Sequence, residues 1–448
     1  MVNIHVDFNE RLGKIKPMHG VGQPPMNGKS SSYFKYLKEA HIPYSRLHDV
    51  GGAYGGFLYV DIPNIFRDFN ADENDPKSYD FTFTDWLIKS LKEYDCEPVY
   101  RLGVTIENYH DTKAYRIFPP ADMEKWARIC EHIIRLFNVG WADGFHLNIT
   151  YWEIWNEPDN GVDERTNMMW HGTMEQYFEL YKAASTHLKA CFGDSIKVGG
   201  YASCGFYAVY ETYEGVADNS AAYGTDISVD EATERKLYHF AFFQIFIGFV
   251  TKEKLPLDFF SYHSYVNVPL TLKMQDFAEK SLRDAGLTDT EIHLNEWNLA
   301  HTLQNRGTLK ACAETTAMMC AMQNRKMAMM CYYDARIGAS IYAGMFNPLT
   351  YEPFPTYYGF KAFGSLYALG TQTDCKSDSE EVYAVAATDG KTNGLLIVNT
   401  GEDAEITTDL PQNMQAYIID ESHSLEPIAL DGNRFLLKQY QVVYFETK

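Results

Sequence analysis

The stretch from residue 257 to residue 334 decides the fold, because strand-like and helical segments alternate along it. It holds three short apolar and aromatic runs, LDFFSYHSY (257–265), EIHLNEW (291–297) and MAMMCYYD (327–334). Runs of this length and composition are typical of buried strands. Between them, Met274–Ala285 and Leu309–Gln323 carry apolar residues at helical spacing. This alternation predicts parallel strands that are joined by helical crossovers.

The same alternation continues toward the N-terminus. Five more strand-like runs come first: Met18–Gly22, Tyr44–His48, Pro98–Val104, Ile149–Trp155 and Ile196–Gly200. Helical patterns separate them, for example at Met123–Phe137 and Glu175–Cys191. Strands alternating with helices over about 350 residues predict an α/β fold, a (β/α)8 TIM barrel. A doubly wound sheet would need a glycine-rich phosphate turn after its first strand, and Pro24 and Pro25 interrupt the one candidate.

The pattern of the sequence changes after residue 366, where helical spacing gives way to short alternating runs. Short alternating runs are separated there by turn dipeptides such as Asp389-Gly390 and Asn393-Gly394, which predicts an antiparallel β-sandwich as an accessory domain. The opening segment Asn3–Phe8 also has the pattern of a strand. We therefore expect residues 1–15 to join the β-sandwich, residues 16–365 to form the barrel, and residues 366–448 to form the accessory domain.

Composition excludes several classes of function. The 448 residues are 46% hydrophobic, so the chain can bury a core and is not disordered as a whole. With 39 basic and 60 acidic residues the net charge is −21, which argues against nucleic acid or an anionic membrane as a partner. Aromatic residues make up 15% of the chain, and some of them could stack on a sugar. Composition leaves a homo-oligomer open.

The first residues lack a basic segment followed by a long apolar run, and the apolar stretch at 240–250 is too short to cross a bilayer. The 8 cysteines form no CxxC pair. These features predict a cytoplasmic protein with reduced cysteines. If a signal peptide had already been removed from this sequence, the protein would instead be secreted or periplasmic.

Two glutamates stand where barrel strands end, which is where this fold carries its reactive groups. Glu157 follows the fourth strand in YWEIWNEPD (151–159), and Glu296 ends the seventh in EIHLNEWN (291–298). A single glutamate at a strand end is usually a partner in a salt bridge. Two of them, each framed by Asn and Trp, indicate the paired carboxylates that glycosidic bond cleavage requires.

These two motifs resemble the clan A retaining glycoside hydrolases, and most of all glycoside hydrolase family 39, which contains β-xylosidases and α-L-iduronidases. The resemblance implies a TIM barrel with a β-sandwich, and release of a terminal glycosyl residue by double displacement. It implies that Glu157 is the general acid/base, that Glu296 is the nucleophile, and that Asn156 binds the sugar 2-hydroxyl. No cofactor and no metal is implied.

Residues on neighbouring strands are candidates to support this pair. Arg46 and His48 alternate on the second strand and share one face, and Arg46 on the inner face would keep Glu296 charged. Its alternative role is a structural ion pair. The resemblance extends to His263 and Tyr265 on the sixth strand, and it implies that Tyr265 donates to Glu296 while His263 lines the acid/base side. Trp297, next to the proposed nucleophile, completes this set.

The eighth strand departs from the clan pattern, which often places a Trp there as the floor of the sugar subsite. The run here is CYYDAR (331–336), so Tyr333 would replace the Trp. Asp334 and Arg336 alternate and would add an ion pair near the pocket. Arg336 could bind the carboxylate of a uronic acid, or it could only neutralise Asp334.

Two other classes of function stay open. A metal-dependent barrel hydrolase needs clustered histidines and carboxylates at strand ends, whereas His19, His48 and His263 occur singly. A catalytically silent carbohydrate-binding barrel would tolerate the loss of one carboxylate, whereas both are present. We expect an oligosaccharide or glycoside as substrate. The long segment from Asp49 to Asp80 would wall the site and favour a pocket for a chain end.

Overall fold

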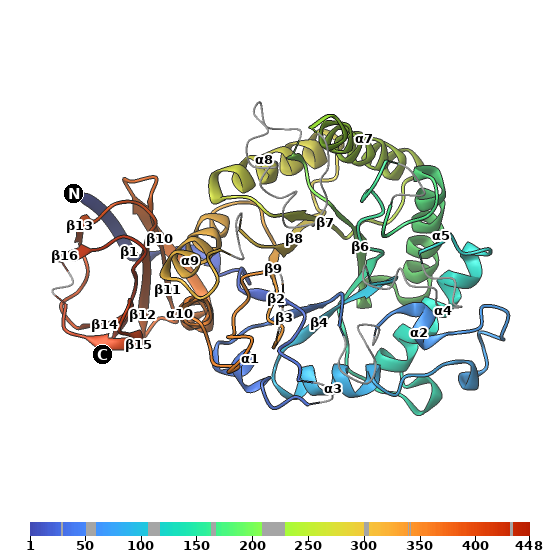
Figure 1. Cartoon of the computed structure of the whole chain (residues 1–448), viewed down its shortest axis with the longest axis horizontal. Helices are drawn as coiled ribbons and strands as arrows, with labels where there is room; N and C mark the ends of the chain where they lie inside the picture. The colour runs from blue at the N-terminus through green and yellow to red at the C-terminus, as the bar shows by residue number, and fades with distance from the viewer. Residues whose placement is uncertain are drawn as a thin grey trace.

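The computed structural model describes residues 1–27, 30–50, 60–105, 117–162, 167–207, 229–299, 304–338, 340, 342–430 and 433–448. Its larger part is a closed barrel of eight parallel strands that pair in sequence order from β2 to β9, with β9 closing on β2 (Figure 1). The strands are β2 (Gly20–Gly22), β3 (Tyr44–Leu47), β4 (Glu97–Leu102), β5 (Tyr151–Ile154), β6 (Lys197–Ser203), β7 (Phe259–Ser264), β8 (Glu291–Trp297) and β9 (Met329–Tyr333). The predicted TIM barrel is confirmed.

Helices follow the strands and form the outer ring of the barrel (Figure 1). They are α1 (Lys35–Glu39), α2 (Ile62–Ile65), α3 (Thr84–Glu93), α4 (Met123–Asn138), α5 (Met174–Phe192), α7 (Val229–Glu253), α8 (Val268–Asp284), α9 (Leu309–Gln323) and α10 (Pro355–Leu369). The segment expected to wall the site contains α2 and a single 3-10 turn at Pro76–Ser78, and its residues 51–59 lie outside the described residues.

Side-chain alternation explains how the strands build both a core and a polar interior. On β5, Trp152 and Ile154 are fully buried in the main hydrophobic cluster, whereas Glu153 lies between them and binds Arg46 from β3. On β7, Phe260 and Tyr262 belong to the same cluster, and Ser261 donates to Glu153. Residues that alternate with the core residues therefore form a polar network inside the barrel.

The accessory domain is one hydrogen-bonded sheet of nine strands in the order β15-β14-β17-β12-β11-β10-β1-β13-β16, and both chain ends lie in it (Figure 1). Its strands are β1 (Val2–Lys14), β10 (Thr371–Ser377), β11 (Val382–Thr388), β12 (Asn393–Asn399), β13 (Ala404–Thr408), β14 (Met414–Ile419), β15 (Ser424–Ile428), β16 (Arg434–Leu437) and β17 (Val442–Thr447). The separate C-terminal β module is confirmed, but its sheet is mixed, because β1 pairs antiparallel with β10 and parallel with β13.

Both faces of this sheet are covered. On β12, Leu395 and Ile397 belong to a second hydrophobic cluster within the module, whereas Leu396 and Val398 belong to the cluster of the barrel. The barrel-facing side packs on α9 and α10. The domain boundary at residue 365 stays a prediction, and it falls inside α10. Among the described helices, none is long and apolar enough to cross a membrane.

Candidate active site

The end of β5 turns sharply and directs two consecutive polar side chains into the mouth of the barrel. Trp155 and Glu157 both have a positive φ, 72° and 45°, which is unfavourable for residues with a side chain. The backbone is held in this shape because the Trp155 N–H donates to Leu102 O at 2.8 Å and the Glu157 N–H donates to Ala202 O at 3.0 Å. Strained backbone that is held by its neighbours is often found at functional sites.

The two predicted glutamates meet at this mouth. A carboxylate oxygen of Glu157 lies within 4.8 Å of a carboxylate oxygen of Glu296. Their residue exposures are 6% and 7%, so both are nearly desolvated while neither is sealed off. A separation of about 5–5.5 Å between carboxyl groups is the geometry of retaining glycosidases, and inverting enzymes need a wider gap for a water molecule.

His263 from β7 lies between the two carboxylates. Its Nδ1 is 2.6 Å from Glu157 Oε1, and its Nε2 is 3.8 Å from Glu296 Oε2. Burial lowers the pKa of His263, but the charge of Glu296 and the hydrogen bond to Glu157 outweigh burial and raise this pKa above its ordinary value. His263 is therefore hydrogen-bonded to Glu157 and lies at ion-pair distance from Glu296.

Arg46 from β3 organises the nucleophile side of the pair. Its Nε donates to Glu153 Oε2 at 2.8 Å, its Nη1 to Glu296 Oε2 at 3.0 Å and its Nη2 to Asn156 Oδ1 at 2.5 Å. Burial opposes its charge, but Glu153 and Glu296 together raise the pKa of Arg46. Arg46 therefore stays cationic and fixes three side chains at once.

Tyr265 completes the surroundings of Glu296. Its hydroxyl donates to Glu296 Oε1 at 2.5 Å, so each oxygen of this carboxylate faces a donor. Burial and the charge of Glu157 raise the pKa of Glu296 above its ordinary value, although the charges of His263 and Arg46 and the hydrogen bond from Tyr265 oppose that rise. These three side chains favour the ionised form that a nucleophile requires.

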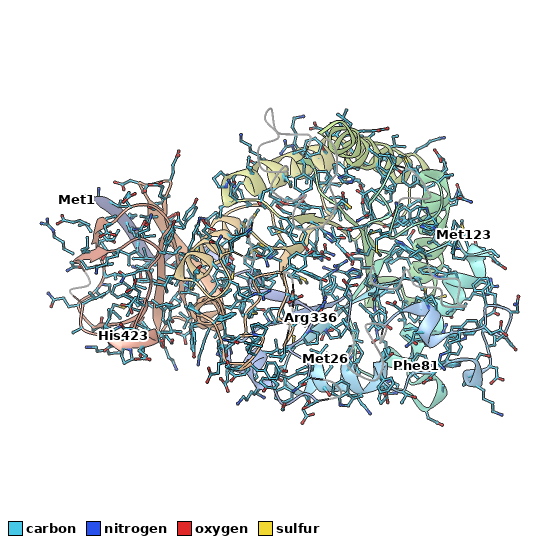
Figure 2. The ribbon with its side chains drawn as sticks, in the orientation of Figure 1. Met1, Met26, Phe81, Met123, Arg336 and His423 are labelled. Atoms are coloured by element: carbon cyan, nitrogen blue, oxygen red, sulfur yellow. The ribbon has the colours of Figure 1, made fainter. Side chains whose placement is uncertain are left out.

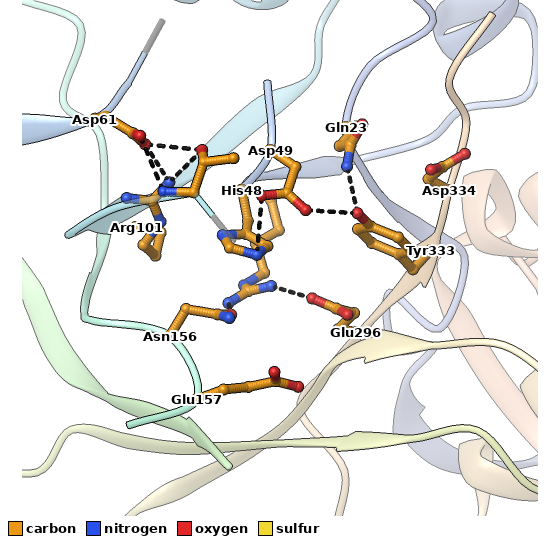
Figure 3. Close-up of polar contacts among 12 residues, drawn as sticks. Gln23, His48, Asp49, Asp61, Arg101, Asn156, Glu157, Glu296, Tyr333 and Asp334 are labelled. Carbon is orange, nitrogen blue, oxygen red and sulfur yellow. Dashed lines mark hydrogen bonds and ion pairs between the residues drawn. The ribbon is translucent and has the colours of Figure 1, made fainter. Parts of the chain in front are cut away.

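A chain of hydrogen bonds lines the opposite wall of the mouth. Arg336 Nε donates to Gln23 Oε1 at 2.8 Å, Gln23 Nε2 donates to the Tyr333 hydroxyl at 2.8 Å, and that hydroxyl donates to Asp49 Oδ2 at 2.7 Å. Asp49 Oδ1 lies 3.2 Å from Nε2 of His48. Figure 3 shows the Tyr333 hydroxyl directed toward Gln23 and Asp49, and His48 beside Asp49.

His48 is neutral in this setting. Its burial, and next the positive charges of Arg101 and Arg46, place its pKa well below the ordinary value. Because Asp49 accepts from Nε2, the Nδ1 atom carries the lone pair, and no described residue forms a hydrogen bond to it.

Two of the predicted site residues, Trp297 and Asp334, lie differently from the expectation, whereas Arg336 forms the predicted pair with Asp334. Trp297 is fully buried and packs edge-on against Tyr332 with 5.1 Å between ring centroids, so it belongs to the core behind β8. Asp334 is also fully buried, and its carboxylate points away from Glu296 (Figure 3). Arg336 lies over the barrel (Figure 2), where its Nε is 3.6 Å from Asp334 Oδ2. This places Arg336 close to its neutralising partner.

Sequence reasoning missed three residues that shape the site. Glu153 holds Arg46 and accepts from Ser261 and Asn295, and strand parity on β5 could have indicated it. Asp159 accepts from the Ser203 hydroxyl at 2.8 Å, and burial together with Glu157 raises the pKa of Asp159 to about 7.

The third missed residue is Tyr342, in the segment that follows β9. Its ring lies 5.4 Å from the ring of Tyr265 and 4.9 Å from that of Tyr333. Burial raises the pKa of Tyr342, and the charge of Glu296 is the next largest cause. The backbone oxygen of Tyr342 accepts from Arg306 at 3.2 Å, which anchors the aromatic wall. No sequence pattern pointed to this residue.

The same three side chains, Glu157, His263 and Glu296, are close enough together to hold a metal ion. A cation would compete there with the guanidinium of Arg46 and the hydroxyl of Tyr265, which face the two oxygens of Glu296. The donor set thus fits a protein that keeps this carboxylate in hydrogen bonds better than one that offers it to a metal.

Two β-xylosidases are similar to this chain in sequence. A β-xylosidase from Caldicellulosiruptor saccharolyticus is 25% identical over 278 residues, which are 59% of this chain and 46% of that protein. A β-xylosidase from Geobacillus stearothermophilus is 22% identical over 229 residues, 47% of this chain and 37% of that protein. The matched part spans less than half the length of either relative.

Solved structures share the fold over the whole chain. A glucosidase from Croceicoccus marinus superposes with a TM-score of 0.76 at 18% identity, covering 100% of this chain and 99% of that one. A family 39 β-xylosidase from Caulobacter crescentus gives a TM-score of 0.66 at 15% identity, with 100% and 99% covered. The family model of the glycosyl hydrolases family 39 matches residues 2–305 of this chain. This chain belongs to the glycosyl hydrolases family 39, as its two glutamate motifs indicated.

Proposed function

We propose that this protein is a retaining glycoside hydrolase that releases a terminal sugar, with Glu296 as nucleophile and Glu157 as general acid/base. One observation carries the proposal. Two buried carboxyl groups lie within 4.8 Å of each other. Arg46 and Tyr265 donate to Glu296, whereas Glu157 contacts His263 and Asn160. Different surroundings give two neighbouring carboxyl groups different pKa values.

In the first step, Glu296 attacks the anomeric carbon while Glu157 gives its proton to the leaving oxygen. The electron pair of the glycosidic bond leaves with that oxygen, and a glycosyl ester forms on Glu296. Arg46 and Tyr265 hold the two oxygens of Glu296, so the attacking atom is oriented before the substrate arrives. Asn156, whose Oδ1 is occupied by Arg46, is left with its amide N–H groups to donate to the sugar 2-hydroxyl.

In the second step, Glu157 takes a proton from water and the resulting hydroxide attacks the same carbon. The ester bond to Glu296 breaks, and the sugar leaves with its configuration retained. His263, which contacts Glu157 directly, is placed to share the proton as Glu157 changes from acid to base.

For the substrate, we propose a neutral terminal pentose, as in a β-xyloside. The support is the β-xylosidase description of both curated relatives and the pairing of Arg336 with Asp334 and Gln23. Because Asp334 balances the charge of Arg336, the attraction of Arg336 for a uronate carboxylate is weakened. We also propose a cytoplasmic location, since all eight cysteines are free thiols.

The experiment is a panel of aryl glycosides (xyloside, arabinoside, galactoside, glucuronide and iduronide) assayed with the wild type, Glu296→Ala and Glu157→Ala. We expect xyloside hydrolysis with retention, seen by NMR of the first-formed product, and loss of turnover in Glu296→Ala. Glu157→Ala should lose most activity on substrates with poor leaving groups and regain it with azide. Wild-type rates in Glu296→Ala, or an inverted product, would refute the proposal.

A further inference from the structure

A second group of ligand-type side chains lies outside the candidate active site, between the neighbouring helices α4 and α5. Glu131 comes from α4, and His187 and Cys191 come from α5, where a spacing of four residues puts them on one face. One ligand atom from each lies within 4.8 Å of the others. Cys191 is next to the last residue of α5, after which the chain enters β6. The group therefore lies toward the end of the barrel where strands begin, opposite the end that carries Glu157 and Glu296.

The geometry points to a zinc site: we propose that Glu131, His187 and Cys191 bind one Zn²⁺ and leave its fourth position to water. Thiolate, imidazole and carboxylate are the three ligand types that zinc selects. His187 Nε2 lies 2.6 Å from Glu131 Oε2 and 3.8 Å from Cys191 Sγ. With bonds of about 2.0–2.3 Å, tetrahedral zinc separates such atoms by roughly 3.3–3.6 Å, so side-chain shifts below about 1 Å would form the site.

The surroundings orient the carboxylate for this role. Arg135, four residues after Glu131 on α4, donates its Nε to Glu131 Oε1 at 2.5 Å, which leaves Oε2 facing His187. Arg135 is itself fixed, because its guanidinium lies 5.4 Å from the ring centroid of Phe192. Partners of this kind behind a ligand fix its orientation in metal sites. The positive charge of Arg135 also weakens the binding of a dication, so the site is expected to be exchangeable.

Access and protonation fit a reversible site. Cys191 is exposed, while the side chains of His187 and Glu131 are 25% and 12% exposed, so an ion can enter from solvent. Burial raises the pKa of the Cys191 thiol, and the charge of Glu131 raises it further. Zinc would replace the thiol proton of Cys191, so binding should release a proton and strengthen as the pH rises.

The test is a titration of the chelator-treated full chain with Co²⁺, which reports a thiolate ligand by a charge-transfer absorption. We expect saturation at one equivalent, displacement by Zn²⁺, and an apparent Kd that falls about tenfold or more per pH unit between about pH 6 and 8. Cys191→Ser should abolish the absorption, and His187→Ala and Glu131→Gln should each weaken binding at least about tenfold. Cys375→Ser, which changes the half-buried thiol of β10, is the matched control and should bind like the wild type.

Calorimetry with Zn²⁺ gives a second measurement of binding for each variant, and a denaturant titration of the same variants separates lost binding from lost folding. The proposal is overturned if the wild type shows no charge-transfer absorption, or if Cys191→Ser or His187→Ala binds cobalt as the wild type does. Equal loss in Cys375→Ser would also overturn it, since that thiol lies in the accessory sheet.

Discussion

Replacing Tyr265 with Phe removes a hydroxyl that donates to the nucleophile and keeps the aromatic ring. The hydroxyl that is lost donates to Glu296 Oε1 at 2.5 Å, while Arg46 keeps its contact with Oε2. The ring of Tyr265, and its contact with Tyr342, stays in place in the variant. The substitution therefore tests what this hydroxyl does to Glu296, and it also removes the hydrogen bond between Tyr265 and Tyr342.

The size of the effect follows from the charge of the acceptor. A hydrogen bond to a charged group contributes about 1.5–3 kcal/mol, and one pKa unit corresponds to about 1.36 kcal/mol. The phenol favours ionised Glu296, so its loss raises the pKa of Glu296 by about one to two units. Glu296 must be ionised to attack, so the acidic limb of kcat/KM should move to higher pH by the same amount.

The assay is the pH dependence of kcat/KM on an aryl glycoside with a good leaving group. Tyr333→Phe is the matched control, because the Tyr333 hydroxyl donates to Asp49 and not to Glu296. Its acidic limb should stay where it is in the wild type. An unmoved limb in Tyr265→Phe, or an equal shift in Tyr333→Phe, would refute the assignment of Tyr265 as the donor that sets the charge of Glu296.

Three further outcomes are expected. Arg46→Met leaves Glu153 and Glu296 buried without their cation, and should lower the free energy of unfolding by about 3–5 kcal/mol, measured by denaturant titration. Asp159→Asn should move the alkaline limb of kcat/KM to lower pH by up to about one unit, because above a pKa of about 7 the Asp159 charge helps Glu157 to keep its proton. Tyr342→Ala should reduce kcat/KM by up to about tenfold, mainly through KM, since aromatic contacts are worth roughly 0.5–1.5 kcal/mol; an unchanged KM would argue against its place in the sugar pocket.

The barrel could be predicted from sequence because each of its strands is apolar on the side that faces the helices. The eight predicted runs overlap the eight barrel strands in order. The turn dipeptides after residue 366 correctly predicted the C-terminal β module. The parallel pairing of β1 with β13 could not be predicted, because no short connection links the two strands and fixes their direction. Hairpin signals describe strands that are neighbours in sequence, and the first strand of the chain has none.

Strand parity also predicted part of the site, and it failed where the strands become irregular. Parity correctly indicated that Arg46 and His48 share a face and that His263 and Tyr265 do. Beyond the end of β9 it gave Asp334 and Arg336 a common position at the pocket, but the chain has left the sheet there, and Asp334 turns away (Figure 3). Tyr342 lies in the same irregular segment, so neither a period nor a motif could reveal it.

The irregularity on β8 explains why Trp297 is in the core and Glu296 is at the mouth. In a regular strand Asn295 and Glu296 would face opposite sides. The pairing of β7 with β8 shifts register between Tyr262 and His263, where Leu294 and Glu296 are the partners, so β8 carries one extra residue there.

With that extra residue, Asn295 reaches Glu153 and Glu296 reaches Arg46, and both point inward. After β5, the positive φ angles of Trp155 and Glu157 have the same effect: the adjacent side chains of Asn156 and Glu157 both point inward. A regular barrel could bring only every second residue to its interior. Two local departures from regular geometry, at the ends of the fourth and seventh barrel strands, are what let the chain gather two carboxyl groups with an amide beside each one.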